Sequence, residues 1–257
     1  MNPLVVRGCA FGTGHEKICV PLTAPDTLSL RQQAKAAIKA GCDLVEWRVD
    51  ALKDGLHLDV MRPALRALRE EMGEKPILFT FRTKEEGGLT PAAWEAYAAL
   101  YRAAVEEPNG ADLFDLEVNR GEERVAALMQ AIKQKGGHVV MSYHDFHKTP
   151  EQTAIQAIFR RMVEKGADIG KVAVMPRTKQ DVLTLMQAAA WAGETYKDRL
   201  FIAISMGPLG MLSRLSGYLT GSCLTFGTAG RSSAPGQLPA KTLRAALSLL
   251  PGEEIEP

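Results

Sequence analysis

The sequence has few cysteines and no long apolar run, and each absence excludes a class of protein. Its four cysteines, Cys9, Cys19, Cys42 and Cys223, lack CxxC or histidine-associated spacing, which argues against a zinc site or a disulfide framework. No stretch approaches the roughly 20 apolar residues that span a bilayer, and residues 1–17 lack the apolar centre of a signal peptide. We therefore expect a cytoplasmic protein without a membrane partner.

An excess of either charge is also absent. The 31 lysines and arginines nearly cancel the 30 aspartates and glutamates, so no bulk positive field attracts nucleic acid. With 46% hydrophobic and 24% charged residues among 257, the composition is that of a globular protein with a sizeable core. A small molecule is the partner that this composition favours.

Short β-branched apolar runs alternate with longer stretches of helical period, which is the pattern of parallel strands joined by crossover helices. The rhythm repeats eight times in units of roughly 30 residues, which favours a single (β/α)8 TIM barrel of the α/β class over residues 1–257. The expected strands are 18–22, 43–49, 76–82, 112–118, 137–143, 168–175, 200–206 and 223–226.

The segments around these strands complete the expected fold. Residues 28–40, 92–105 and 182–192 have apolar positions three and four apart, as outer helices do. No GxGxxG fingerprint follows the first strand, which argues against an open nucleotide-binding sheet. Residues 1–17 are expected to form a short N-terminal β-hairpin that closes the bottom of the barrel.

Charged residues stand where barrel strands should be apolar, because such strands are packed on both faces. Glu46 and Arg48 are two apart in the second strand and share a face, as part of either a site or a structural ion pair. Arg82 ends the third strand, Glu86 follows it, and residues 115–117 add an Asp-Leu-Glu run. Barrel enzymes build their sites at the carboxyl ends of strands, so we expect these charges to converge there.

Two residues have the chemistry of a catalyst. Lys171 lies inside the sixth strand, and an inward amine would be partly desolvated, which favours the neutral form that attacks carbonyls. A lysine extending to the other end of the strand fits the sequence equally well. His144 leaves the fifth strand in a Ser-Tyr-His-Asp-Phe segment, and imidazole moves protons near neutral pH. Taken alone, His144 fits a hydrogen-bonded loop residue better than a catalyst.

The last two strands lead into loops rich in glycine and proline. Arg214 lies in the first of these loops and offers a planar fork for a carboxylate. Residues 230–237 form the second loop, and a glycine-rich rim there suits a phosphate as well.

Taken together, these features resemble the type I 3-dehydroquinate dehydratase family over nearly the whole chain. Its Asp-Leu-Glu and Ser-Tyr-His-Asp-Phe segments are jointly specific. The residues that carry the resemblance are Glu46, Arg48, Arg82, Glu86, Asp115-Leu116-Glu117, Ser142-Tyr143-His144-Asp145-Phe146, Lys171, Val174-Met175-Pro176, Ser205-Met206-Gly207, Arg214 and Ser233-Ala234-Pro235-Gly236-Gln237.

The resemblance implies the conversion of 3-dehydroquinate to 3-dehydroshikimate and water, a step of the shikimate pathway, without metal or other cofactor. It implies that Lys171 forms an imine, that His144 removes the C2 proton and that Glu86 orients His144. A protonated imine draws electrons from C2, so a base as mild as imidazole suffices.

The resemblance also implies a set of substrate-binding residues and a homodimer. Arg214 would hold the substrate carboxylate with Ser233 and Gln237, while Met206 would pack against the substrate. The complete implied set is Glu46, Arg48, Arg82, Met206, Arg214, Ser233 and Gln237.

Two other interpretations stay open. A class I aldolase acting on a sugar phosphate would share the lysine and differ in the anion that it binds. A catalytically silent barrel would keep the fold and bind a metabolite, since fold alone does not give function. The joint presence of lysine, histidine and carboxylate argues against the silent barrel.

Overall fold

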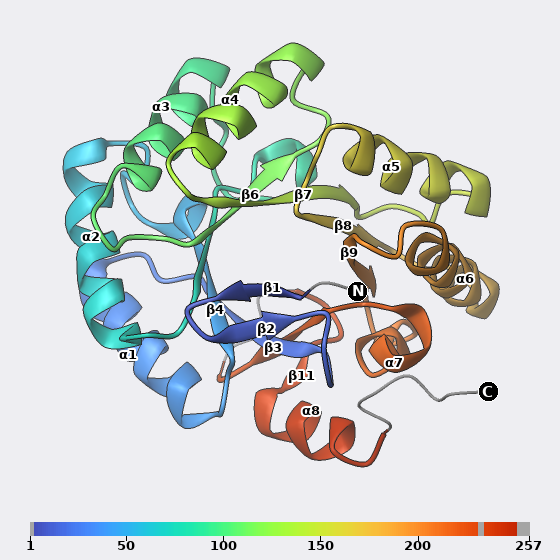
Figure 1. The fold of residues 1–257 in the computed structure, drawn as a ribbon. Coiled ribbons are helices and arrows are strands. Elements are labelled where there is room, and N and C mark those ends of the chain that lie inside the picture. The colour runs from blue at the N-terminus through green and yellow to red at the C-terminus, as the bar shows by residue number, and fades with distance from the viewer. Residues whose placement is uncertain (1–2, 231–233, 251–257) are drawn as a thin grey trace.

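The computed structural model describes residues 3–230 and 234–250, which form a curled parallel sheet surrounded by helices (Figure 1). The strand order is β11-β10-β3-β4-β5-β6-β7-β8-β9. The strands are β3 (Lys17–Leu22), β4 (Leu44–Arg48), β5 (Ile77–Thr80), β6 (Leu113–Glu117), β7 (His138–Asp145), β8 (Ile169–Val174), β9 (Leu200–Ser205), β10 (Leu224–Thr228) and β11 (Leu238–Pro239).

The two ends of this sheet meet between β9 and β10. A bridge joins Phe201 to Ser222, and the Cys223 N–H donates to the Phe201 carbonyl at 2.8 Å. Each of the eight expected strands is found, with ends displaced by a few residues at most. The predicted TIM barrel is therefore confirmed.

Helices and short 3-10 turns connect the strands and cover the outer face of the sheet (Figure 1). The helices are α1 (Thr27–Lys39), α2 (Leu58–Met72), α3 (Trp94–Val105), α4 (Glu122–Gln134), α5 (Gln152–Glu164), α6 (Lys179–Thr195), α7 (Gly217–Thr220) and α8 (Ala240–Leu247), and the 3-10 turns are η1 (Val49–Ala51), η2 (Lys84–Glu86) and η3 (Met211–Arg214).

The helix boundaries differ from the expected ones for local reasons. Helix α6 begins three residues earlier than predicted, because Thr178 and Asp181 form a capping box ahead of the apolar pattern. Helix α3 begins two residues later, because Ala93 has an extended backbone conformation. No helix of the described residues is long and apolar enough to cross a membrane.

The predicted N-terminal hairpin is present and seals one end of the barrel. Strands β1 (Leu4–Val6) and β2 (Cys9–Phe11) pair antiparallel. Val6 and Phe11 are buried in one apolar cluster with Leu44 of β4, at the amino end of that strand. The hairpin therefore packs against the interior of the barrel from its amino-terminal end (Figure 1).

Three aspartates precede strands β4, β6 and β8 and tie each strand to its neighbour. Asp43, Asp112 and Asp168 each accept a backbone N–H of the preceding strand, at 2.7, 2.9 and 2.7 Å. Each also pairs with a basic side chain. The prediction counted these aspartates as strand residues, but they hydrogen-bond the strand ends and the strands begin one residue later.

Candidate active site

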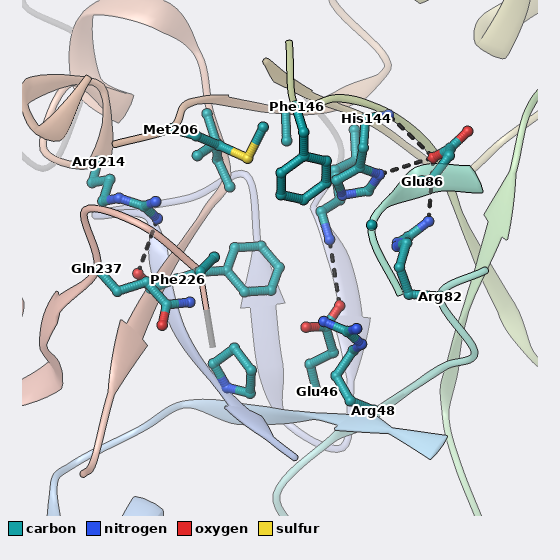
Figure 2. Close-up of a pocket in the computed structure, with 16 residues that line it drawn as sticks. Glu46, Arg48, Arg82, Glu86, His144, Phe146, Met206, Arg214, Phe226 and Gln237 are labelled. Atoms are coloured by element: carbon teal, nitrogen blue, oxygen red, sulfur yellow. Dashed lines mark hydrogen bonds and ion pairs between the residues drawn. The ribbon is translucent and has the colours of Figure 1, made fainter. Parts of the chain in front are cut away.

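A pocket opens at the carboxyl ends of the barrel strands, and charged side chains from several strands point into it (Figure 2). Nine of the ten predicted site residues line it, and Ser233 lies outside the described residues. The lining residues are Pro21, Glu46, Arg48, Arg82, Glu86, Gly87, His144, Phe146, Lys171, Ala173, Ile204, Met206, Arg214, Phe226, Ala234 and Gln237.

Lys171 of β8 points into the barrel, not toward the amino end of its strand. Lys171 is 4% exposed. The Nζ atom lies 3.4 Å from Glu46 Oε1, 3.5 Å from Asp115 Oδ2 and 4.3 Å from the centroid of the Phe226 ring. Two carboxylates and an aromatic face thus surround the amine beside the cavity. Glu46 and Phe226 of this set are labelled in Figure 2.

Arg82 is the centre of a buried charge network beneath the pocket. Its guanidinium lies 2.8 Å from Asp115, 3.0 Å from Glu117 and 3.4 Å from Glu86. Burial disfavours the guanidinium charge, but these carboxylates outweigh it and hold the pKa of Arg82 above its usual range. The network fixes the positions of side chains from β5, β6 and the following loop.

Arg48 is held by a residue that the sequence analysis did not single out. Asp50 of η1 binds the Arg48 guanidinium through two hydrogen bonds of 2.8 and 2.7 Å. The same carboxylate accepts the backbone N–H groups of Arg82 and Leu89, at 3.2 and 3.1 Å. The available signal was position, since Asp50 continues the alternation of Glu46 and Arg48.

His144 and Glu86 form a buried pair on the opposite side of the pocket from Arg214 (Figure 2). The His144 ring Nδ1 and backbone N–H both lie against Glu86 Oε2, at 3.0 and 3.1 Å. Burial lowers the pKa of His144 well below its usual range, and nearby Arg82 and Lys171 lower it further. Burial also raises the pKa of Glu86 to about 8, against the influence of Arg82.

Burial thus disfavours charge on both members of the pair. His144 is a neutral imidazole at neutral pH. Glu86 Oε2 already accepts the His144 backbone N–H, which suits an Nδ1–H donor at the same oxygen, and in that tautomer Nε2 is the ring nitrogen that can accept a proton. A neutral imidazole held at a fixed orientation can act as a general base.

Arg214 of η3 is a buried cation that no carboxylate of the described residues contacts. It is 2% exposed and donates to the carbonyls of Phe226 and Pro235, at 3.3 and 3.1 Å. Its Nε is buried, and none of the described residues accepts a hydrogen bond from it. Burial lowers the pKa of Arg214 to about 10. Gln237 lies next to it in the pocket (Figure 2).

Three further residues line the pocket without having been predicted as site residues in their own right: Gly87, Phe146 and Phe226. The Phe146 and His144 rings stack with centroids 6.4 Å apart. Gly87 has a φ of 83°, and a Cβ there would lie 2.4 Å from the Phe146 ring. Glycine is therefore required for Phe146 to occupy its place, and this contact joins residues far apart in the sequence.

The described residues contain no group of three histidine, cysteine, aspartate or glutamate side chains placed to hold a metal ion.

Comparisons with known proteins agree on one family. The family model for type I 3-dehydroquinase matches residues 18–254. The 3-dehydroquinate dehydratase of Escherichia coli strain K12 is 43% identical over 250 residues, which cover 97% of this chain and 99% of that protein. A crystal structure of the Clostridium difficile type I 3-dehydroquinate dehydratase with covalently modified comenic acid is 36% identical, with a TM-score of 0.93 over 96% of this chain and 97% of that one.

A second solved structure, the 3-dehydroquinate dehydratase of Enterococcus faecalis, is also 36% identical. It has a TM-score of 0.90 over 97% of this chain and 100% of that one. Full-length similarity to these relatives and the match of the family model show that this chain belongs to the type I 3-dehydroquinase family.

Proposed function

We propose that this protein dehydrates 3-dehydroquinate to 3-dehydroshikimate through an imine on Lys171. The observation that carries the proposal is the convergence of three groups in one pocket: the Lys171 amine, the neutral His144 imidazole and Arg214, which no carboxylate of the described residues contacts. The relatives named as 3-dehydroquinate dehydratases support the substrate. The relative with covalently modified comenic acid supports covalent chemistry.

The charges of the pocket indicate where the substrate carboxylate binds. Arg48, Arg82 and Lys171 each have a carboxylate partner, whereas the described residues give Arg214 none. A carboxylate can form two charge-assisted hydrogen bonds with such a guanidinium fork. We therefore place the substrate carboxylate at Arg214, with Gln237 as a further contact. The family resemblance implies Ser233 as another contact, and that residue lies outside the described part of the chain.

This orientation directs the ketone toward Lys171 on the other side of the pocket. The Lys171 amine adds to the ketone carbon, and loss of water from the adduct leaves a protonated imine. His144 accepts the C2 proton, and the electrons of the C2–H bond move toward the imine to form an enamine. The enamine electrons then expel the C1 hydroxyl as His144 returns a proton to it, and water hydrolyses the product imine to free Lys171. Glu86 holds the His144 ring in place for both transfers.

The remaining pocket residues bind the body of the substrate. Glu46, Arg48 and Arg82 offer hydrogen bonds to the ring hydroxyls, and Met206 packs against the ring. Glu46 also keeps Lys171 directed into the cavity, since it contacts the amine.

Trapping of the imine tests the proposal. The protein is incubated with 3-dehydroquinate and reduced with borohydride, and the added mass is then mapped by peptide mass spectrometry. We expect an adduct on Lys171 and formation of 3-dehydroshikimate. The Lys171→Met variant should lose both, whereas Lys197→Met, which changes an exposed lysine outside the pocket, should keep both.

Two results would contradict the proposal. Turnover of sugar phosphates without turnover of 3-dehydroquinate would favour a class I aldolase. A folded protein that binds shikimate-like carboxylates and forms neither adduct nor product would favour a catalytically silent barrel.

The organisation of the whole protein stays a prediction in three respects. We propose that residues 1–257 form one domain, because Val6 and Phe11 of the hairpin pack inside the barrel. A homodimer follows from the family resemblance alone, and light scattering with size-exclusion chromatography would test it. A cytoplasmic location is likewise a prediction from the sequence.

A further inference from the structure

Asp115 of β6 is a carboxylate beneath the pocket, at the point where Lys171 and Arg82 meet. It is 0% exposed and is not among the described residues that line the cavity. Its Oδ1 accepts hydrogen bonds from Arg82 at 2.8 Å and Ser142 at 2.6 Å, and its Oδ2 lies 3.5 Å from Lys171 Nζ. Any effect of Asp115 on a bound substrate must therefore pass through Lys171 or Arg82.

We propose that Asp115 is a positioning residue that holds Lys171 Nζ at the face of the Phe226 ring and keeps a negative charge beside that nitrogen throughout imine formation. The proposal rests on the proposed function. The nitrogen has Glu46 at 3.4 Å, Asp115 at 3.5 Å and the Phe226 centroid at 4.3 Å. Of the two carboxylates only Glu46 lines the cavity, so a substrate can compete for Glu46 but not for Asp115.

The balance of the reaction explains why a permanent carboxylate is useful at this place. A lysine ammonium and a ketone become a protonated imine and water: a C=N bond replaces the C=O bond, and two ammonium protons leave with the carbonyl oxygen. The positive charge stays on the same nitrogen. A carboxylate beside this nitrogen stabilises the positive charge of the protonated imine. Without it, burial would disfavour the imine in its protonated, electron-withdrawing form.

Glu117 provides a matched control for this role. It lies two residues away on the same strand, is 1% exposed and binds Arg82 at 3.0 Å. Its other contacts are to the Thr83 backbone N–H and hydroxyl, and the described residues show no ion pair between Glu117 and Lys171. Asp115→Asn and Glu117→Gln thus each remove a buried charge from Arg82, but only Asp115→Asn removes one from Lys171.

Steady-state kinetics and borohydride trapping separate the two variants. We expect Asp115→Asn to lower kcat and the rate of adduct formation at least about tenfold, because a hydrogen bond to a charged group contributes about that much or more, and to raise KM through Arg82 about as much as Glu117→Gln does. Glu117→Gln should trap adduct severalfold faster than Asp115→Asn, with its defect mainly in KM through Arg82. Equal trapping rates in the two variants, or wild-type trapping in Asp115→Asn, would overturn the proposal.

A milder variant keeps the test available if Asp115→Asn does not fold. Ser142→Ala removes the 2.6 Å hydrogen bond that orients Asp115, together with the 3.0 Å hydrogen bond that Ser142 accepts from Arg82, and retains the charge of Asp115. It should slow trapping by about threefold, since loss of one such bond is worth about 0.5–1.5 kcal/mol; an unchanged rate would count against the proposal. A wild-type protein inactive on 3-dehydroquinate would reject the proposed function, whereas an active one with unaffected variants would reject only the role of Asp115.

Discussion

Replacing Arg214 by methionine should weaken carboxylate binding without unfolding the protein, although Arg214 is among the most deeply buried charges of the chain. Its pKa is lowered by burial to about 10 from an ordinary 12.5. Each tenfold change in an acidity constant corresponds to about 1.4 kcal/mol, so the charge destabilises the unliganded fold by about 3 kcal/mol. A linear thioether of similar length removes this cost.

The substitution also removes two hydrogen bonds. Arg214 donates to the Phe226 and Pro235 carbonyls, and losing a charged donor costs about 1.5 kcal/mol or more for each. The two effects nearly cancel, so we expect the free energy of unfolding to change by about 1 kcal/mol. For a chain of this size that moves Tm by about 2–4 °C. Urea unfolding of wild type and Arg214→Met measures this directly.

Binding should respond far more strongly than stability. Loss of a charge-assisted partner of the substrate carboxylate costs about 1.5–3 kcal/mol, which corresponds to a KM about 10- to 150-fold higher. A shikimate-like carboxylate and the matching carboxamide sharpen the assay. Calorimetry should show wild type preferring the carboxylate and Arg214→Met binding both alike. If the variant retained the preference, or lost more than about 3 kcal/mol of stability, the assignment of Arg214 would be wrong.

Three further predictions concern His144, Glu86 and the N-terminal hairpin. His144→Ala should lose turnover yet still trap imine slowly, because the Lys171 amine remains; no trapped adduct at all would contradict the separation of roles. The free energy of unfolding of Glu86→Gln, relative to wild type, should increase by about 2–4 kcal/mol from pH 5 to pH 8. The reason is that the wild-type carboxyl has its pKa raised to about 8, so the stability that its protonated form contributes is lost as the pH rises toward that value. Equal differences in urea unfolding at both pH values would refute this. Phe11→Ala should lower the free energy of unfolding by about 3–5 kcal/mol, since Phe11 is fully buried against the barrel interior. A loss under about 1 kcal/mol would mean that the hairpin does not seal the barrel.

The fold could be predicted from sequence because periodicity marks each strand, but the ends of the strands depend on contacts. Asp43 and Asp168 precede apolar runs and were counted with them, whereas in space they hydrogen-bond the neighbouring strand. No pattern within one strand contains that information. The resulting errors are one residue at the strand starts and up to two residues at the strand ends.

The candidate site shows the same division between local pattern and contact. Lys171 and His144 stand out because their chemistry is unusual inside a strand or at its end. Gly87 and Phe146 do not, since a glycine in a loop and an aromatic after a strand are ordinary until the 2.4 Å approach of a Cβ to the ring is known. Asp50 continues the alternation of Glu46 and Arg48, but its role follows from its two hydrogen bonds to Arg48.

The inward positions of neighbouring strands change from apolar to polar at one level of the barrel, and this change accounts for both the pocket and the hairpin. Strand register places Thr80 beside Asp115 and Ser142 beside Lys171. Two residues earlier on each of these four strands the inward side chain is apolar: Leu78, Leu113, Val140 and Ile169. The polar level, nearer the carboxyl ends of the strands, cannot add to the apolar core. The apolar level must therefore be shielded from water at the amino ends of the strands. The hairpin supplies that closure, and the alternation of residues within each strand sets the depth at which a substrate can bind.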